Sequence, residues 1–317
     1  QLVLEGQLAA LLYSNDPSKK TIWLSANAFS GYNFSMTQLT TLQPIDYLII
    51  GHLTVDETPQ GLRLGGTAAY SALTAKAMGW RVGIVTSWAE EIPTTDLDGI
   101  QVVNYRSDHS TRFLNRYTQN GRQQFVHSIA PGLDYYHIPE SWRSASIVHL
   151  GPVAQEVEPG MVRNFPSAML GITPQGWLRN WRSDGLVYPG EWPEADFVLQ
   201  RAGAIVLSVE DVGGDESRIE EMVVSSRVIA VTEAHQGVQL YWNGDVRRFR
   251  PPEVEELDAT GAGDIFAAAF FTRLHTTRDP WEAARFATQL SAISVTRPGL
   301  QGAPTLDEIN NTIVEIL

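Results

Sequence analysis

The chain has 317 residues, 43% of them hydrophobic, which is enough for one large domain or two small ones. Its formal net charge of −13 leaves no basic footprint for a nucleic-acid duplex, so we expect no nucleic-acid partner. The absence of cysteine excludes disulfides and thiolate metal sites. We expect a cytoplasmic protein without a membrane partner, because no apolar run approaches the roughly 20 residues of a membrane span and the first residues show no signal-peptide pattern.

Residues 1–44 do not follow the pattern of the rest, and we expect an N-terminal extension for which the sequence indicates no role. From residue 46 onward, short apolar runs alternate with helical patterns, which predicts a domain over residues 46–317. Uniformly apolar strands separated by helices indicate an α/β fold with a parallel sheet covered on both faces. The predicted strands are residues 46–51, 81–87, 146–151, 168–173, 204–208 and 227–232, and the predicted helices are residues 67–78, 279–297 and 305–317.

Two segments break this alternation and predict β-hairpins. Residues 111–128 carry Asn120-Gly121 at their centre, and residues 237–249 carry Asn243-Gly244. Asn-Gly between alternating side chains is a strong hairpin signal. The first hairpin is interpreted either as part of a small sheet folded over a site or as a surface hairpin without a role.

The stretch DATGAGD at residues 258–264 places glycines and an acid directly before a long apolar helix. The opening N–H groups of a helix have no partners inside the helix, and glycines let an anion approach them. Gly261, Ala262 and Gly263 therefore predict an anion hole, and Asp264 beside them predicts a base that accepts a proton from an attacking hydroxyl. The alternative is an ordinary helix start, capped by Asp258 or Thr260.

A second pair of glycines, Gly65 and Gly66, stands just before the helix predicted from residue 67. Paired glycines allow a ligand to approach the backbone, and Asp56 after the first strand could accept hydrogen bonds from a polyol. A plain tight turn is the alternative interpretation.

With both glycine sites in view, residues 46–317 resemble the ribokinase-like (PfkB) family of carbohydrate kinases. DATGAGD at 258–264 matches the family's D-T-x-G-A-G-D signature, VTEAHQGVQLYWNG at 231–244 resembles its nucleotide-side turn, and ISVTRPGLQGAPT at 293–305 resembles its closing stretch beside the adenine. The resemblance implies a ribokinase-like three-layer sandwich with a mostly parallel central sheet. It also implies a small β lid that includes the hairpin at residues 111–128.

The resemblance implies a kinase that moves the γ-phosphoryl group of ATP to a hydroxyl of a small sugar or polyol, with Mg²⁺ as a cofactor; it leaves K⁺ and a homodimer open. It implies Asp264 as the base and the amides of residues 261–263 as the anion hole. Asp211 would organise Mg²⁺ indirectly, and Asp258 and Thr260 would lie at a monovalent cation. The residues expected to bind nucleotide are Ser208, Thr232, Gly237 and Gly299. The residues expected to bind substrate are Asp56, Gly65, Gly66, Tyr70, Glu156, Gln175 and Arg179.

Several positions depart from the family pattern. Ser208 and Asp211 stand where the family's N-x-x-E element has Asn and Glu, and Ala234 replaces a glycine of the nucleotide turn. Tyr70 stands where ribokinases carry a substrate-binding Asn, which argues against ribose. Together with LGPVAQEVEP and GITPQGWLRNW, Tyr70 resembles the myo-inositol kinase branch, so a cyclic polyol is the leading acceptor.

Three other functions remain as alternatives. One is a sugar- or nucleotide-binding protein without activity on the same fold, which the changes at Ser208, Asp211 and Ala234 allow but the presence of Asp264 opposes. Another is a nucleoside kinase. The third, a dinucleotide-dependent oxidoreductase, would require G-x-G-x-x-G after the first strand, where this chain has GHLTVD.

Overall fold

The computed structural model describes residues 2–4, 7–9, 42–118 and 121–316. The chain divides into two units, Gln1–Thr41 and Leu42–Leu317. The described part of the first unit is an antiparallel pair of strands, β1 (Leu2–Leu4) and β2 (Gln7–Ala9). Most of the expected N-terminal extension, residues 1–44, lies outside the described residues.

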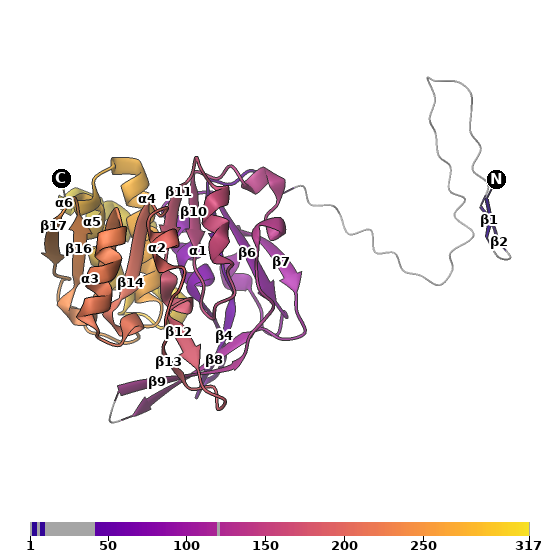
Figure 1. Cartoon of the computed structure of the whole chain (residues 1–317), viewed down its shortest axis with the longest axis horizontal. Coiled ribbons are helices and arrows are strands. Elements are labelled where there is room, and N and C mark those ends of the chain that lie inside the picture. Colours follow the sequence, from indigo (N-terminus) through magenta and orange to yellow (C-terminus); the bar gives the residue numbers. More distant parts are fainter. Residues whose placement is uncertain (1, 5–6, 10–41, 119–120, 317) are drawn as a thin grey trace, which may run out of the picture. The chain divides into compact units, whose positions relative to one another are not determined.

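A nine-stranded sheet forms the centre of the second unit (Figure 1). All neighbouring strands from β15 to β7 in the order below are parallel, whereas β16 and β17 continue the sheet antiparallel. The order is β17 (Asp245–Phe249), β16 (Val238–Trp242), β15 (Val228–Thr232), β14 (Ala204–Ser208), β11 (Met169–Ile172), β10 (Ile147–Leu150), β3 (Tyr47–Ile50), β6 (Val82–Trp88) and β7 (Gln101–Arg106). All six strands predicted from apolar runs are present.

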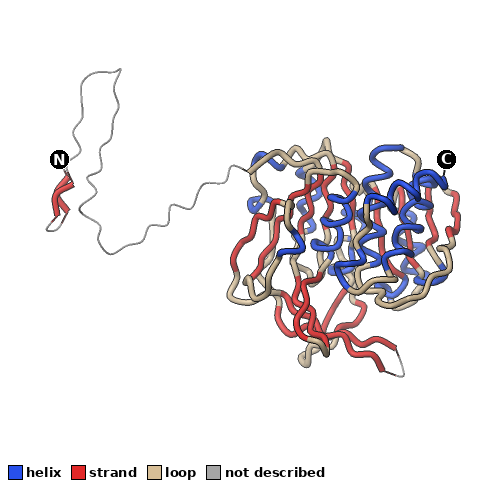
Figure 2. The backbone as a smooth tube through the Cα atoms, turned by 180° about the vertical axis from the view of Figure 1, so that it is seen from behind, coloured by secondary structure: helices blue, strands red, loops and turns tan. Residues whose placement is uncertain are grey.

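Helices cover both faces of this sheet, as the continuous apolar strands required. Helices α2 (Ala195–Leu199) and α3 (Glu216–Ser225) pack on one face (Figure 1). The opposite face, seen from behind in Figure 2, carries α1 (Thr67–Ala77), α4 (Ala262–Thr277), α5 (Pro280–Ser294) and α6 (Leu306–Ile316). The predicted helices at residues 67–78, 279–297 and 305–317 correspond to α1, α5 and α6, and the long apolar helix expected after DATGAGD is α4. None of the helices in the described residues has the length and apolarity that crossing a membrane requires.

Short 3₁₀ turns make many of the connections between these elements. They are η1 (Thr95–Leu97), η2 (Tyr135–His137), η3 (Glu140–Trp142), η4 (Pro159–Asn164), η5 (Pro174–Gly176), η6 (Val209–Val212), η7 (Ala234–Gln236) and η8 (Gly299–Gly302). Five of them, η1 and η5 to η8, contribute residues to the lining of one large cleft.

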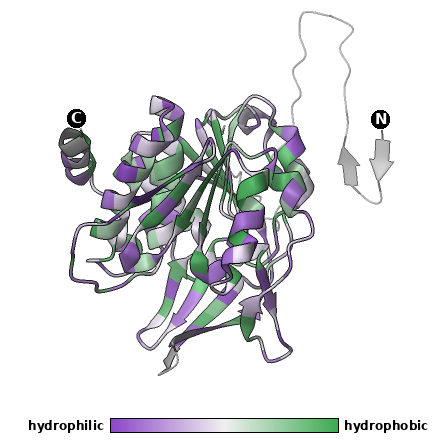
Figure 3. Cartoon of the chain, turned by 60° about the vertical axis from the view of Figure 1, so that its left-hand side comes forward, coloured by the Kyte–Doolittle hydropathy of each residue, from purple (hydrophilic) through white to green (hydrophobic). Residues whose placement is uncertain are grey.

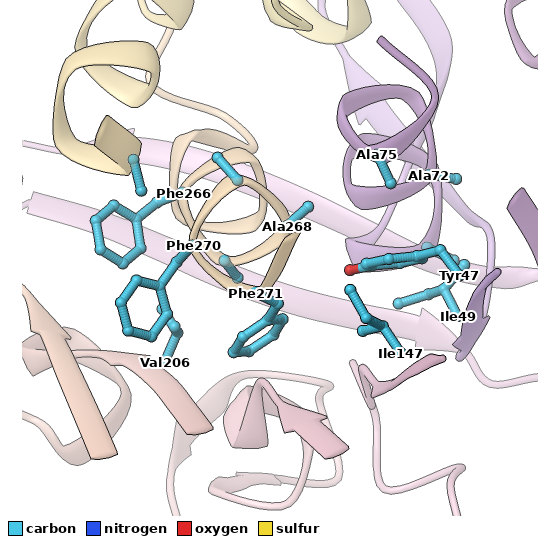
Figure 4. Close-up of a cluster of buried hydrophobic side chains, with 14 of the residues drawn as sticks. Tyr47, Ile49, Ala72, Ala75, Ile147, Val206, Phe266, Ala268, Phe270 and Phe271 are labelled. Carbon is cyan, nitrogen blue, oxygen red and sulfur yellow. The ribbon is translucent and has the colours of Figure 1, made fainter. Parts of the chain in front are cut away.

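Helix α4 is buried against the sheet because its sequence is apolar on nearly every side. Phe266, Phe270 and Phe271 point toward the strands in Figure 4, and each is at most 1% exposed. Burying a phenylalanine contributes about 1.5–3 kcal/mol. Gly171 of β11 makes the approach possible, since a Cβ there would lie 2.6 Å from the Phe271 ring. This packing fixes the position of the first turn of α4.

The hairpin predicted at residues 111–128 belongs to a separate four-stranded sheet. Strands β8 (Thr111–Thr118) and β9 (Gly121–Ser128) pair antiparallel, and β8 pairs parallel with β4 (Thr54–Thr58), which in turn pairs with β5 (Gly61–Gly65). A two-stranded sheet of β12 (Arg179–Trp181) and β13 (Val187–Pro189) lies beside β9. In Figure 3 these small sheets project from the body and mix hydrophilic and hydrophobic residues, unlike the green central strands.

Of the two predicted Asn-Gly turns, only the second lies wholly within the described residues. At the second hairpin, β16 and β17 are joined by Asn243 and Gly244 with φ of 53° and 77°. Positive φ at both central residues is the twisted turn that Asn-Gly favours, which confirms this prediction. At the first hairpin, Asn120 lies outside the described residues.

Candidate active site

A cleft of about 2540 Å³ lies along the carboxyl ends of the parallel strands. Asp56 and Phe113 of the small sheet line the cleft, and so does the start of α4. The far end of the cleft is bordered by η7, which follows β15, four strands from β3 in the sheet order. In open parallel sheets, ligands bind outside the carboxyl ends of the strands, so this is where a site is expected.

The first turn of α4 opens into the cleft. Gly261 precedes the helix in the left-handed region (φ 81°), and the amide of Ile265 closes the first turn by donating to its carbonyl. The Ala262 amide donates to Ala259 at 3.2 Å, whereas the amides of Gly261 and Gly263 have no acceptor within the described part of the chain. Two of the three amides expected at an anion hole are therefore available to a ligand.

The two glycines of this turn face different surroundings. A Cβ on Gly261 would lie 2.3 Å from the ring of Tyr70, so the turn rests directly on that aromatic ring. A Cβ on Gly263 would meet nothing within 4 Å. Position 261 therefore requires glycine because the Tyr70 ring leaves no room for a side chain. Position 263 has open space in front of it, into which a ligand can come close to the main chain.

Helix α1 holds Asp264 in place. Thr67 donates a hydrogen bond from Oγ1 to Oδ1 of Asp264 at 2.7 Å, and the Ser71 hydroxyl donates to its carbonyl at 3.2 Å. Burial raises the pKa of Asp264 to about 6. The hydrogen bond from Thr67 and the charge of Arg179 lower this pKa, and Asp211 and Asp56 raise it further. A carboxylate with this pKa is well suited to accept a proton near neutral pH.

Asp258 holds the approach to this turn. Its oxygens accept the amides of Thr260 and Gly299, each at 2.9 Å, and Arg63 lies 4.0 Å away. Burial acts to raise the pKa of Asp258, but the bonds from Thr260 and Gly299 and the charge of Arg63 leave it below its ordinary value. Asp258 thus ties the loop before α4 to η8.

Across the cleft, Asp211 is organised by its neighbours after β14. It accepts the Ser208 amide at 2.8 Å and the Gln175 side chain at 3.2 Å, while the Ser208 hydroxyl accepts the Glu210 amide. Burial raises the pKa of Asp211, and the charge of Arg179 lowers it. The residues expected to organise metal and phosphate therefore form one hydrogen-bonded group that lines the cleft.

The residues expected to bind substrate are not all in the cleft. Asp56, Gly66, Tyr70, Gln175 and Arg179 line it. Arg179 donates from Nη1 to the Val153 carbonyl at 2.9 Å, and its guanidinium lies over the ring of Phe113, 5.3 Å from the ring centre.

Gly65 and Glu156 lie outside the lining of the cleft. A Cβ on Gly65 would lie 2.3 Å from Oδ2 of Asp56, so this glycine makes room for the Asp56 carboxylate. Glu156 is 5% exposed, and its carboxylate accepts the amides of His52, Val153 and Ala154 at 2.7–3.0 Å. These contacts tie Glu156 to the main chain.

The far end of the cleft combines turns of unusual backbone with apolar walls. Ser208, Thr232, Gly237 and Gly299, the residues expected to bind nucleotide, all line the cleft, and a Cβ on Gly299 would lie 3.9 Å from the Tyr70 hydroxyl. Ala234 has φ of 47°, the left-handed conformation for which glycine would be the usual residue. The Ala, Val, Leu and Pro residues of the lining between positions 234 and 300 are Ala234, Val238, Pro251, Pro252, Val254, Leu257, Ala259, Ala262, Ala292, Val295, Pro298 and Leu300.

Sequence reasoning missed Thr67 and Thr173, which both line the cleft. Thr67 is the first residue of α1, and Thr173 follows β11. The available signal was the placement of a hydroxyl directly after Gly66 and directly before Pro174-Gln175. Their partners Asp264 and His149 are remote in sequence, so the contacts themselves could not be inferred.

Comparisons with known proteins agree with this geometry. Residues 193–306 match the family model described as pfkB family carbohydrate kinase. The fructokinase of Escherichia coli is 25% identical over 269 residues, which is 76% of this chain and 84% of the relative.

Two solved structures share the fold. One is a pyrophosphate-dependent kinase in the ribokinase family complexed with a pyrophosphate analog and myo-inositol (TM-score 0.68, 19% identity, 81% of this chain and 98% of that chain). The other is a fructokinase of Xylella fastidiosa with bound ATP (TM-score 0.68, 17% identity, 85% and 98%). The α/β architecture predicted from the sequence is therefore the ribokinase-like fold. The fold, the family match over residues 193–306 and the related kinases agree: the chain is similar to the carbohydrate kinases of the pfkB family.

Proposed function

We propose that this enzyme transfers the γ-phosphoryl group of ATP to a hydroxyl of a cyclic polyol or sugar, with Asp264 as the general base. The observation that carries the proposal is the first turn of α4, where the carboxylate of Asp264 stands beside the available amides of Gly261 and Gly263. A base and an anion hole within one helical turn can serve the attacking hydroxyl and the transferred phosphoryl group together.

The proposed step is an in-line displacement. Asp264 accepts the proton of the acceptor hydroxyl, the acceptor oxygen forms a bond to the γ-phosphorus, and the bond between that phosphorus and the β,γ-bridging oxygen breaks to release ADP. Charge on the phosphoryl oxygens is stabilised by the amides of Gly261 and Gly263 and by the positive end of α4. Loss of one such donor typically costs about 10²–10³-fold in turnover.

Asp211 suits a divalent cation in this scheme. Mg²⁺ prefers oxygen ligands and is commonly bound through one or two carboxylates plus substrate phosphates. The carboxylate of Asp211 lines the cleft and is oriented by Ser208 and Gln175. When bound there, Mg²⁺ would supply positive charge to the donor phosphates. K⁺ is proposed only as an accessory ion, near the loop of Asp258 and Thr260.

The donor is proposed to be a nucleotide rather than pyrophosphate, although one structural neighbour is pyrophosphate-dependent. The lining of the cleft from Ala234 to Leu300 includes twelve Ala, Val, Leu and Pro residues. Apolar walls with a few polar groups are typical of sites that hold a base, whereas pyrophosphate has no apolar surface to bury. Equal turnover with pyrophosphate in place of ATP would contradict this choice.

The acceptor is proposed to bind at the small-sheet end of the cleft. Asp56 offers acceptors for hydroxyl groups, and Gln175 and Arg179 offer donors. A neighbour of the same fold binds myo-inositol, which supports a cyclic polyol as the leading acceptor.

The test is a panel of myo-inositol, D-fructose, D-ribose and nucleosides with ATP and Mg²⁺, followed by ADP release. We expect ADP release that depends on one polyol or sugar. Binding of polyols in calorimetry without any ADP release would instead indicate a binding protein without activity, and turnover of nucleosides alone would indicate a nucleoside kinase.

A further inference from the structure

Below the cleft, three side chains on adjacent parallel strands form a continuous chain of hydrogen bonds. The hydroxyl of Tyr47 on β3 lies 2.9 Å from Nδ1 of His149 on β10. Nε2 of His149 lies 2.9 Å from Oγ1 of Thr173, which follows β11. Tyr47 and His149 are both 0% exposed, and Thr173, at 6%, lines the cleft. The chain therefore starts in the core and ends at the site.

The strand register explains why these three residues meet. Tyr47 is opposite Ile147, and His149 is two residues further along the same strand; His149 is opposite Gly171, and Thr173 is again two residues further. Because side chains alternate between the faces of a sheet, all three lie on the face covered by α4. In Figure 4 the hydroxyl of Tyr47 points toward α4. The His149 ring meets the Phe271 ring edge-on, with the ring centres 5.0 Å apart.

Only one orientation of these hydrogen bonds, from donor to acceptor along the three side chains, leaves no buried donor unsatisfied. If Thr173 donated to Nε2, then Nδ1–H would donate to Tyr47, and the phenolic hydrogen would need another acceptor. Among the described residues Tyr47 has no other partner, and an unsatisfied buried donor costs about 1–3 kcal/mol. In the opposite direction Tyr47 donates to Nδ1 and Nε2–H donates to Thr173, so both core groups are satisfied.

This direction leaves the hydroxyl hydrogen of Thr173 without an acceptor in the described protein. From the geometry we infer that Thr173 is a specificity-determining residue, whose hydroxyl donates a hydrogen bond to an oxygen of the acceptor, and that Tyr47 and His149 are positioning residues that impose this direction. The inference rests on the proposed function, since it assigns a residue to the acceptor end of the same cleft. Thr173 directly precedes η5, the turn that carries Gln175.

The buried ring of His149 suits a fixed relay. Burial lowers the pKa of His149 to about 3, so the ring stays neutral and keeps one donor and one acceptor. A neutral imidazole held between two hydroxyl groups cannot exchange the roles of its nitrogens unless both partners reorient.

One measurement tests the relay without any substrate. Nitrogen-15 NMR of the histidine rings in the full-length protein distinguishes the two neutral tautomers. We expect His149 to carry its proton on Nε2, and Tyr47→Phe, which removes the donor to Nδ1, to alter that signal. A proton on Nδ1 in the wild-type protein would overturn the inference.

Kinetics test the role of Thr173 at the acceptor. With myo-inositol, D-fructose and D-ribose as probes, we expect Thr173→Val to raise the acceptor KM on the order of threefold to tenfold, the range that one hydrogen bond supplies. The KM for ATP should be unchanged, and Thr173→Ser, which keeps the hydroxyl, should match the wild type. An unchanged acceptor KM in Thr173→Val would overturn the inference.

The two positioning residues are tested by combining variants. Tyr47→Phe should raise the acceptor KM in the wild-type background. It should have no further effect in the Thr173→Val background, because the hydroxyl that Tyr47 orients through His149 is then absent. Additive effects would assign Tyr47 to stability alone and would count against the relay. If the wild-type enzyme turned over none of the three probes, the proposed function would fail, while the tautomer of His149 would still decide the direction of the relay.

Discussion

The hydroxyl of Thr67 donates a 2.7 Å hydrogen bond to Oδ1 of Asp264, 197 positions further along the chain. Thr67, Tyr70 and Ser71 occupy positions i, i+3 and i+4 of α1, which share one face of a helix. That face contacts the carboxylate, the glycine turn and the main chain of the first turn of α4. Helix α1 therefore places the proposed base relative to Gly66 at the acceptor end.

The Thr67 bond should set the pH at which Asp264 becomes active. A base must be ionised to accept a proton, so turnover should rise with pH through about 6. Because the bond from Thr67 lowers the pKa of Asp264, Thr67→Val should move the acid limb of the kcat profile to higher pH. The charged groups around the carboxylate, Arg179, Asp211 and Asp56, are unchanged in this variant.

The control is Thr67→Ser, which keeps the hydroxyl and should keep the wild-type profile. A Thr67→Val enzyme whose acid limb coincides with that of the wild type would show that this bond does not tune the base. A uniform loss of kcat at every pH would instead indicate displacement of the carboxylate.

Replacement of the proposed base should separate binding from chemistry. Asp264→Asn keeps the shape of the side chain but cannot accept the proton, so we expect turnover to fall about 10²–10⁴-fold. ATP binding, measured by calorimetry, should persist. Near-normal turnover would remove Asp264 from the role of base.

The same variant has a predicted effect on stability. The pKa of Asp264 is raised from 3.8 to about 6, so the folded state binds its proton more tightly than the unfolded state and stability falls as pH rises from about 4 to 6. Asp264→Asn should therefore raise the melting temperature at pH 8 and leave it nearly unchanged at pH 4, where the wild-type carboxyl is mostly protonated. Thermal unfolding at the two pH values checks this, and an equal shift at both would contradict it.

Two glycine variants distinguish a glycine that leaves room for a ligand from a glycine that leaves room for a neighbouring side chain. Gly263→Val should leave the melting temperature nearly unchanged, because a Cβ there meets nothing within 4 Å, yet should abolish turnover by occupying the phosphoryl site. Gly261→Ala should destabilise the protein, because its Cβ would lie 2.3 Å from Tyr70 and its φ is 81°. Wild-type kinetics in Gly263→Val would exclude the anion hole.

Much of the fold could be predicted because it follows local rules. The runs DYLIIG and RVIAVT are apolar on both sides, which is typical of strands buried under helices on both faces, and they form β3 and β15. Asn243-Gly244 requires positive φ at two successive positions, a requirement read from two residues alone. Strand order in the sheet could not be predicted, because it depends on pairings between segments remote in sequence.

The candidate site could be predicted from the sequence where the residues that would act together are consecutive. The turn Gly261–Asp264 could be interpreted because glycines, acid and helix follow one another. Tyr70 was expected to contact substrate because it stands where ribokinases carry a substrate-binding Asn. Its ring also supports Gly261, a contact across 191 positions that no local pattern reveals.

A variant of Glu156 can distinguish a role in substrate binding from a role in holding the main chain. Its carboxylate accepts the amides of His52, Val153 and Ala154, so Glu156→Gln would turn an amide donor toward backbone donors. We expect this variant to lose about 1–3 kcal/mol of unfolding free energy, measured in urea, with an unchanged acceptor KM. A raised acceptor KM at unchanged stability would return Glu156 to the acceptor site.

The proposed role of Asp211 leads to a prediction about metal dependence. Chelation with EDTA should abolish turnover, and added Mg²⁺ should restore it.

Asp211→Asn keeps a carbonyl oxygen that can accept the Ser208 amide, so the turn after β14 should persist while the negative charge is lost. We expect the Mg²⁺ concentration for half-maximal turnover to rise on the order of tenfold, because Mg²⁺ binds a neutral amide far less well than a carboxylate. The acceptor KM should stay near its wild-type value, since Gln175 and Arg179, the proposed acceptor residues beside Asp211, are unchanged in this variant. An unchanged Mg²⁺ requirement in a variant that folds normally would mean that the cation is held by the donor phosphates and other groups, and that Asp211 only orders its own turn.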